Sequence, residues 1–198
     1  MQKWFPEALE KYTIYSVFDL LLEYINEGRI TLTDQNHLER TTYHDPCNYG
    51  RKSEKAFGHG YYQEGRIITR ACCPDYKDME PHGEFNYCCG AGGGAWAMPY
   101  DEERLAYGKQ KADQIRDTGA QVVMAPCHNC RDQIMKGLGK EHAEGRMDMG
   151  NYKETVYLWE LVANTLVIEP WSEEEIEKAH AERDAQFERD GIDLEEEF

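Results

Sequence analysis

Five of the seven cysteines fall into three short groups whose spacing suits a metal centre. These five are Cys47, Cys88, Cys89, Cys127 and Cys130. Adjacent cysteines form a disulfide only with strain, so the Cys88–Cys89 pair is better explained as two thiolates facing one centre. Five thiolates from three separated segments indicate an iron–sulfur cluster rather than a single ion.

The residues that follow Cys89 suit the same chemistry. Gly90, Gly92 and Gly93 can present backbone N–H groups to a negatively charged cluster with no side chain in the way. A helix that we expect to begin near Asn129 would add a positive dipole end beside Cys127 and Cys130. Both features would lower the pKa of the thiolates.

Structural zinc is the alternative for the five cysteines, although its four-coordinate geometry would leave one of them spare. The remaining two cysteines, Cys72 and Cys73, end a predicted helix and could be a redox pair or extra ligands. We expect them to be small buried hydrophobic residues instead.

Two ionisable residues lie just before Cys47, separated from it by Pro46. His44 and Asp45 are candidate catalytic residues that could relay a proton to a substrate thiolate. They could instead orient the Cys47 loop by hydrogen bonding. Arg66 and Arg51 could attract an anion, but we expect ordinary surface ion pairs.

The composition narrows the class of protein. The 198 residues carry a formal net charge of −16, which argues against nucleic acid or an anionic membrane surface as a partner. No apolar run is long enough to span a membrane and no leader peptide is evident, so we expect a reducing, cytoplasmic setting. Association with a membrane would then require partner subunits.

The chain is predicted to form one body over residues 1–168 and an acidic helical tail over 169–198. Residues 171–198 hold twelve acidic and three basic side chains. Ser172 and Glu175 form a predicted capping box that opens the tail helix.

Strands and helices are expected to alternate in the body. The predicted helices cover residues 14–27, 61–72, 101–118 and 154–167, with Ser16 as an N-cap, Asp101 as a start and Gly119 as a stop. The predicted strands cover residues 40–44, 77–79, 85–87 and 121–125. This order favours an α/β fold with a small, open, largely parallel sheet flanked by helices. Each cysteine group would then follow the carboxyl end of a strand, where sites assemble in such sheets.

Three segments carry a family resemblance. They are residues 43–51 (YHDPCNYGR), 86–94 (NYCCGAGGG) and 125–130 (APCHNC). They resemble the cysteine-rich CCG domain of heterodisulfide reductase catalytic subunits, and most of all the heterodisulfide reductase-like iron–sulfur subunit of sulfate-reducer electron-transfer complexes. The resemblance covers roughly residues 14–168.

The resemblance implies a noncubane [4Fe-4S] cluster bound by the five cysteines and used in disulfide reduction or electron transfer towards it. It implies partners such as a ferredoxin-like iron–sulfur protein, a flavoprotein or a membrane cytochrome subunit, and a thiol or disulfide substrate. Family members often carry two motif copies and a ferredoxin-like region, whereas this chain shows one copy and no such region. We therefore expect a split subunit or a piece of a larger one, with electrons arriving from another polypeptide.

Two further functions remain open from the sequence. The domain could be an electron relay without a substrate of its own, or a zinc-stabilised interaction module within a redox complex. A cluster with an iron position open to thiols would favour the enzyme, and a closed cluster would favour the relay. One zinc without sulfide would favour the module.

Overall fold

The computed structural model describes residues 10–11 and 15–191. Ile14, the first residue of the helix predicted over 14–27, and residues 192–198 of the acidic tail lie outside the described residues. The chain divides into two compact units, residues 1–167 and 168–198. The first unit carries all of the cysteines.

A three-stranded sheet lies at the centre of the first unit. Its strands are β1 (Thr41–Tyr43), β2 (Val122–Met124) and β3 (Glu154–Val156), in the order β1-β2-β3. Both strand pairs are parallel. Every residue of β1 and β2 is buried, as expected for a parallel sheet covered on both faces. The predicted small, parallel α/β sheet is confirmed.

Helices and shorter helical turns connect and cover the strands. The helices of the first unit are α2 (Val17–Asn26), α3 (Ser53–Phe57), α4 (Glu64–Cys72), α5 (Asp101–Thr118), α6 (His128–Asp132), α7 (Gly139–Ala143) and α8 (Leu158–Thr165). The turns are η1 (Asn48–Lys52), η2 (Gly83–Phe85), η3 (Gly92–Ala97) and η4 (Gln133–Leu138).

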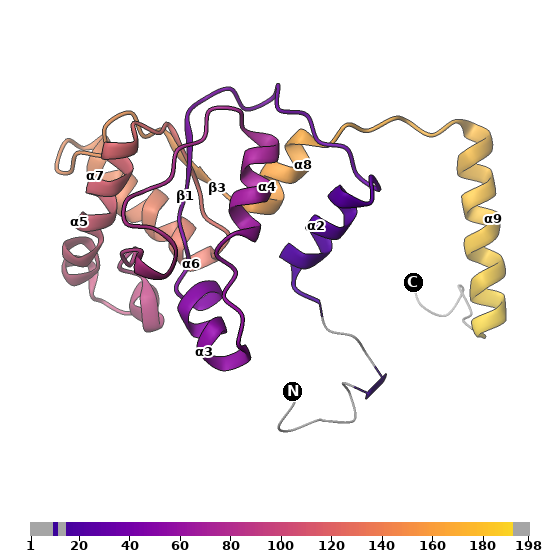
Figure 1. The fold of residues 1–198 in the computed structure, drawn as a ribbon, viewed down its shortest axis with the longest axis horizontal. Helices are drawn as coiled ribbons and strands as arrows, with labels where there is room; N and C mark the ends of the chain where they lie inside the picture. Colours follow the sequence, from indigo (N-terminus) through magenta and orange to yellow (C-terminus); the bar gives the residue numbers. More distant parts are fainter. Residues whose placement is uncertain (1–9, 12–14, 192–198) are drawn as a thin grey trace. The chain divides into compact units, whose positions relative to one another are not determined.

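Two apolar clusters cover the two faces of the sheet. Figure 1 shows α5 and α7 on one side of the strands and α4, α8 and α2 on the other. The first cluster includes Ile115 of α5 and the cysteines Cys89, Cys127 and Cys130. The second joins α2, α4 and α8 with Tyr43 of β1. Three of the five predicted ligands therefore lie in one of the two cores.

The helix boundaries follow local capping chemistry. The Ser16 hydroxyl accepts a hydrogen bond from the Phe18 N–H at 3.2 Å and caps α2, as predicted. Gly119 ends α5 at φ +70°, a left-handed conformation that glycine adopts without strain. Asp101 is the first helical residue of α5, and Tyr100 precedes it without a side-chain cap.

The two strands predicted between residues 77 and 87 are wrong. The first segment touches β1 through a single parallel bridge between Thr41 and Tyr76, so it runs beside the sheet without forming a ladder. In the second, Gly83 at φ +61° opens the turn η2. Asn86 is buried while Phe85 and Tyr87 are exposed, and Asn86 makes a side-chain hydrogen bond to the 44–47 loop. Cys88 and Cys89 thus follow a turn rather than a strand.

The helix predicted over 154–167 begins too early. Residues 154–156 form strand β3, because the β-branched Thr155 and Val156 pair with β2 at the edge of the sheet. The helix α8 begins only at Leu158, after a cap at Tyr157. The apolar residues of this run therefore serve two elements.

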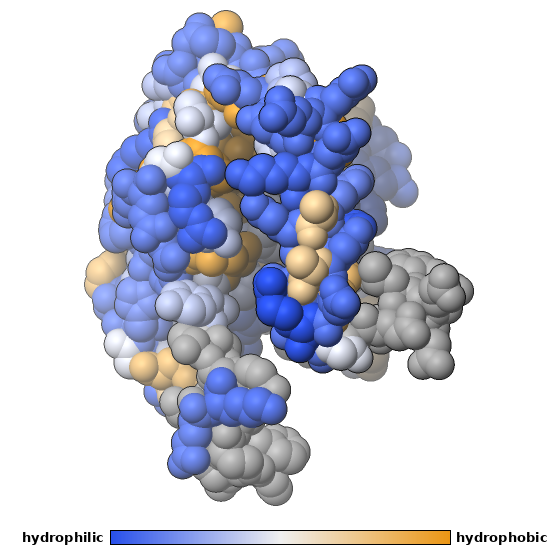
Figure 2. All heavy atoms as spheres, turned by 90° about the vertical axis from the view of Figure 1, so that its right-hand side faces the viewer, coloured by the Kyte–Doolittle hydropathy of each residue, from blue (hydrophilic) through white to orange (hydrophobic). Residues whose placement is uncertain are grey.

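The second unit contains α9 (Glu173–Asp190). Its predicted capping box is confirmed, since the Ser172 hydroxyl accepts from the Glu175 N–H and the Glu175 carboxylate accepts from the Ser172 N–H. None of the residues of α9 is buried. The face of the molecule drawn in Figure 2 is predominantly hydrophilic. Across the described ranges, no helix combines the length and the apolar character needed to cross a bilayer.

Candidate metal centre

The end of β1 delivers the first cysteine. The backbone N–H of His44 donates to the Met124 carbonyl at 2.8 Å and extends the pairing of β1 with β2 by one residue. The chain then turns at Pro46, and Cys47 begins the helical turn η1, where the N–H of Lys52 bonds to the Cys47 carbonyl at 3.0 Å. Cys47 thus follows a strand, as predicted.

The Cys88–Cys89 loop is fastened to the Cys47 loop by hydrogen bonds. The Asn86 side-chain amide donates to the Asp45 carbonyl at 2.8 Å. The backbone N–H of Gly83 donates to the Asp45 carboxylate at 2.9 Å. Asp45 therefore holds both ends of the segment that leads into the cysteine pair.

Gly90 fixes the other side of this loop. It has φ +95°, and a Cβ at this position would lie 2.4 Å from the Arg104 carbonyl oxygen of α5. The Gln133 amide would lie 3.1 Å from the same Cβ. Only glycine fits both the backbone conformation and the space. The glycine after the cysteine pair is therefore needed for close approach to α5.

Cys127 and Cys130 come from the end of β2. Cys127 precedes the first turn of α6, and the Arg131 N–H bonds to its carbonyl at 2.9 Å. Cys130 lies in that first turn, so its sulfur and that of Cys127 are on the same side of the chain. The predicted helix start near Asn129 is confirmed within one residue.

The three cysteine segments line a single pocket. All five predicted ligands face it, together with His44, Asp45, Gly92 and Lys52 among others. Cys88 is exposed and Cys47 is half-buried, whereas Cys89, Cys127 and Cys130 are buried. One side of the pocket is thus open to solvent.

Hydrogen bonds among the thiols shift their pKa values in opposite directions. The Cys130 thiol and backbone N–H groups of residues 129 and 130 stabilise the Cys127 thiolate and lower the pKa of Cys127 to about 6. The Cys130 and Cys88 thiols lower the pKa of Cys89 far below its ordinary value. The pKa values of Cys88 and Cys130 rise in turn, because each of these two thiols donates its proton to a neighbouring sulfur. Neighbouring thiols thus share protons with one another. Positive iron ions bound between them would stabilise the deprotonated thiolates instead.

His44 lies against the buried sulfurs. Its ligating atom and those of Cys89 and Cys130 lie within 4.8 Å of one another. Neither ring nitrogen of His44 has a hydrogen-bond partner among the residues that the structure describes. Burial lowers the pKa of His44, and the ammonium of Lys111 lowers it further. A buried imidazole therefore lies against the cysteine group, and its interaction with the Cys89 sulfur opposes the fall in the pKa of His44.

Asp45 is held by Arg66, for which the sequence predicted only a surface ion pair. Both carboxylate oxygens of Asp45 accept from the Arg66 guanidinium, at 2.6 and 2.7 Å. Arg66 is 1% exposed, so the expected surface ion pair is instead a buried one. Asp78 is a second partner of Arg66, because its carboxylate accepts a hydrogen bond from Arg66 Nε at 2.7 Å. Of the two roles considered for Asp45, this geometry favours orientation of the loop.

Of the other residues considered in the sequence, the glycines lie at or beside the pocket and the remaining two cysteines lie on the opposite face of the sheet. Gly92 lines the pocket, and Gly93 lies in the turn η3 that follows it. Cys72 and Cys73 are buried in the second apolar cluster, on the opposite face of the sheet from Cys89. The Thr165 hydroxyl donates to the Cys72 sulfur at 3.2 Å. These two cysteines are packed as the small hydrophobic residues that we expected.

The donor set fits an iron–sulfur cluster. All seven cysteines are free thiols, so none of the five is consumed by a disulfide. Sulfur is the ligand that iron–sulfur clusters use, and five sulfurs exceed the four that a tetrahedral zinc site needs. The open side at Cys88 leaves room for a further ligand.

The cysteine-bearing part of the chain matches a known protein family. The model of the CCG cysteine-rich domain family matches residues 41–135, which contain all five cysteines of the pocket. Residues 41–135 are a CCG domain. The two cysteines and the glycine that give the domain its name are Cys88, Cys89 and Gly90, and Gly90 is the residue that the contact with α5 requires.

Curated relatives of the CCG domain are redox proteins. The chain is similar to the EtfAB:quinone oxidoreductase of Syntrophomonas wolfei, with 27% identity over 71% of this chain and 20% of the relative. It is 28% identical to one subunit of the dihydromethanophenazine:CoB–CoM heterodisulfide reductase of Methanosarcina acetivorans, over 64% of this chain and 29% of the relative. It is 29% identical to an Hdr-like menaquinol oxidoreductase iron–sulfur subunit of Archaeoglobus fulgidus, over 67% of this chain and 22% of the relative. The chain thus spans less than a third of each relative's length.

Proposed function

We propose that this CCG domain holds a noncubane [4Fe-4S] cluster through Cys47, Cys88, Cys89, Cys127 and Cys130, and serves an oxidoreductase that reduces a disulfide. The observation that carries the proposal is the convergence of five free thiols on one pocket. Relatives named as a heterodisulfide reductase subunit and as an iron–sulfur subunit support it. When bound, the cluster would supply electrons and an iron that can accept a substrate sulfur.

The chain's own residues would prepare the site for a substrate sulfur. The exposed side at Cys88 gives a thiol or disulfide access to the pocket. Asp45, fixed by Arg66, keeps the Cys47 and Cys88–Cys89 loops in register. The buried sulfurs behind them exclude water from the other side.

His44 is the residue best placed to carry a proton. In the overall step the S–S bond of the substrate breaks, and each sulfur takes up one electron and one proton. Two electrons would come from a partner redox subunit, such as an iron–sulfur protein, a flavoprotein or a membrane cytochrome. One proton would pass through His44, which lines the pocket beside the Cys89 sulfur, and the other would come from solvent at the open side near Cys88.

Spectroscopy with a simple thiol tests the proposal. We expect the electron paramagnetic resonance spectrum of the anaerobically purified, oxidised protein to change when 2-mercaptoethanol is added. The variant Cys72→Ala is the control and should respond as the wild type does, because Cys72 lies in the other core. A cluster whose spectrum ignores the thiol would instead be an electron relay. One zinc per chain without sulfide would make the domain a structural module.

A further inference from the structure

Lys111 is buried on the inner side of α5. It is 1% exposed and is among the largest side chains that the structure buries fully. Its ammonium donates to the Gln114 side-chain oxygen at 2.5 Å and lies 3.4 Å from the Met79 sulfur. Gln114 is itself held by a 2.7 Å hydrogen bond to the Pro81 carbonyl. The lysine is thus fixed in place by neutral groups.

The charge of Lys111 lacks a close counter-charge. Among the described residues, no carboxylate lies within 4.0 Å of its ammonium, whereas the buried Arg66 has two such partners. Burying a cation without an anion is costly, and proteins avoid it unless something compensates the charge. The neutral acceptor atoms of Gln114 and Met79 compensate the charge only in part. The residue therefore points to a missing negative group.

The apolar cluster beside the Lys111 ammonium also holds cysteines of the pocket. Met79, which contacts the ammonium, belongs to the same apolar cluster as Cys89, Cys127 and Cys130. Burial lowers the pKa of Lys111 to about 8, and the charges that oppose this fall are those of Asp45 and of the sulfurs of Cys89, Cys130 and Cys88. The ammonium thus contacts the apolar cluster that holds the buried cysteines, and it interacts electrostatically with their sulfurs.

We propose that Lys111 is the buried counter-charge of the cluster and raises its reduction potential. The inference rests on the proposed function, because it needs a negatively charged cluster in the pocket. Reduction adds one negative charge to the cluster, so a fixed cation stabilises the reduced form more than the oxidised form. Lys111 is a positioning residue in this sense, since it acts through the ligands rather than on a substrate.

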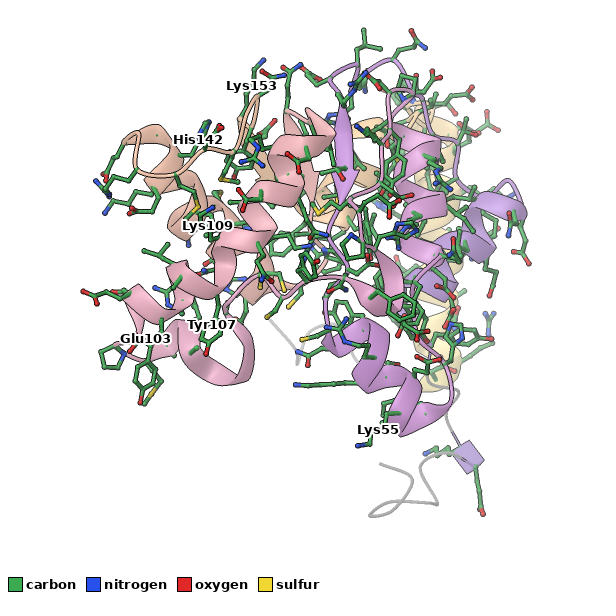
Figure 3. The ribbon with its side chains drawn as sticks, turned by 60° about the vertical axis from the view of Figure 1, so that its left-hand side comes forward. Lys55, Glu103, Tyr107, Lys109, His142 and Lys153 are labelled. Atoms are coloured by element: carbon green, nitrogen blue, oxygen red, sulfur yellow. The ribbon has the colours of Figure 1, made fainter. Side chains whose placement is uncertain are left out.

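The variant Lys111→Met tests this role, because methionine fills a similar volume without charge. In the full chain loaded with the cluster, we expect a midpoint potential more negative than that of the wild type. The control is Lys109→Met on the same helix (Figure 3), whose side chain is 66% exposed and pairs with Asp113 at 3.0 Å. It removes the same charge from the surface, where solvent screens it, and should leave the potential unchanged.

A second readout does not depend on redox chemistry. Loading the cluster should raise the Tm of the wild type by more than that of Lys111→Met, since only the wild type relieves an uncompensated charge on loading. Lys111→Gln, which keeps a donor for Gln114, replaces the methionine variant if that one does not fold. An unchanged potential together with an equal gain in Tm would overturn the proposal, as would a failure of both variants to fold.

The wild type separates this inference from the proposed function. If the wild-type chain contains zinc and no iron, the proposed function is wrong, whatever the variants show. A loaded wild type whose potential and gain in Tm both equal those of Lys111→Met removes only the role of the lysine.

Discussion

At the scale of single residues, the buried pair of Arg66 and Asp45 joins the two loops that carry Cys47 and the Cys88–Cys89 pair. Replacing Arg66 with methionine would leave the Asp45 carboxylate buried and without its partner. We expect the free energy of unfolding to fall by about 3–5 kcal/mol, the usual cost of breaking a buried pair from one side. Urea denaturation at neutral pH measures this change.

Arg70 provides the matched control for Arg66. Arg70 lies on α4, as Arg66 does, and it also pairs with Asp78, but its side chain is 52% exposed. Replacing it with methionine should cost less than about 1 kcal/mol, because solvent screens exposed ion pairs. Equal losses in the two variants would mean that the Arg66 pair is no more than a surface contact.

Gly90 makes a second prediction at this scale. Alanine there would take φ +95° and bring its Cβ to 2.4 Å from the Arg104 carbonyl, so Gly90→Ala should lose stability and bound iron together. Gly94→Ala is the control, because its φ is +87° but no atom lies within 4 Å of the added Cβ. It should cost only the strain of the left-handed backbone, about 1–2 kcal/mol. Iron analysis and thermal melting compare them, and equal iron content in both variants would contradict the close approach.

The residues of the candidate site could be predicted from the sequence, whereas the burial of the charged side chains around it could not. The spacing of the five cysteines and the glycine after Cys89 indicated that they belong to one site. The burial of Arg66 and Lys111 was not readable, because it depends on elements distant in the chain. Arg66 meets Asp45 from 21 positions away, and Lys111 meets Met79 from 32. A charge on a predicted helix gave no signal of either contact.

At the scale of elements, two of the three cysteine groups follow parallel strands and the third follows a turn. β1 and β2 were predictable from short β-prone runs that stop at Pro46 and Pro126. The turn before Cys88 was not, because the alternation of Phe85, Asn86 and Tyr87 resembles a strand. Its polar residue is the buried one, held by the loop after β1. Likewise, only pairing with β2 separates β3 from the helix that follows it.

The two faces of the sheet predict different roles for the cysteines. Cys72 ends α4 in the second apolar cluster, so Cys72→Ala should cost about 1 kcal/mol of stability through the small void it leaves. Its iron content should match that of the wild type. Cys89→Ala, on the pocket side, should abolish bound iron. Retained iron in Cys89→Ala, or lost iron in Cys72→Ala, would show that the ligands are assigned to the wrong face.

At the scale of the whole molecule, the C-terminal unit carries its own local stabilisation. α9 is closed at its start by the capping box of Ser172 and Glu175 and at its end by Gly191 at φ +68°. None of its residues is buried. Ending the chain after Val167 should therefore leave the iron content and the Tm of the first unit unchanged. A loss of iron on truncation would mean that residues 168–198 contribute to the site.

The central claim concerns the content of the pocket, and metal analysis tests it most directly. The chain should be purified without oxygen, and its iron, acid-labile sulfide and zinc should be measured per chain. We predict about four irons and four sulfides, the content of one [4Fe-4S] cluster. One zinc with no sulfide would contradict the account, because the five thiols would then hold a structural ion and the disulfide chemistry would belong to another protein.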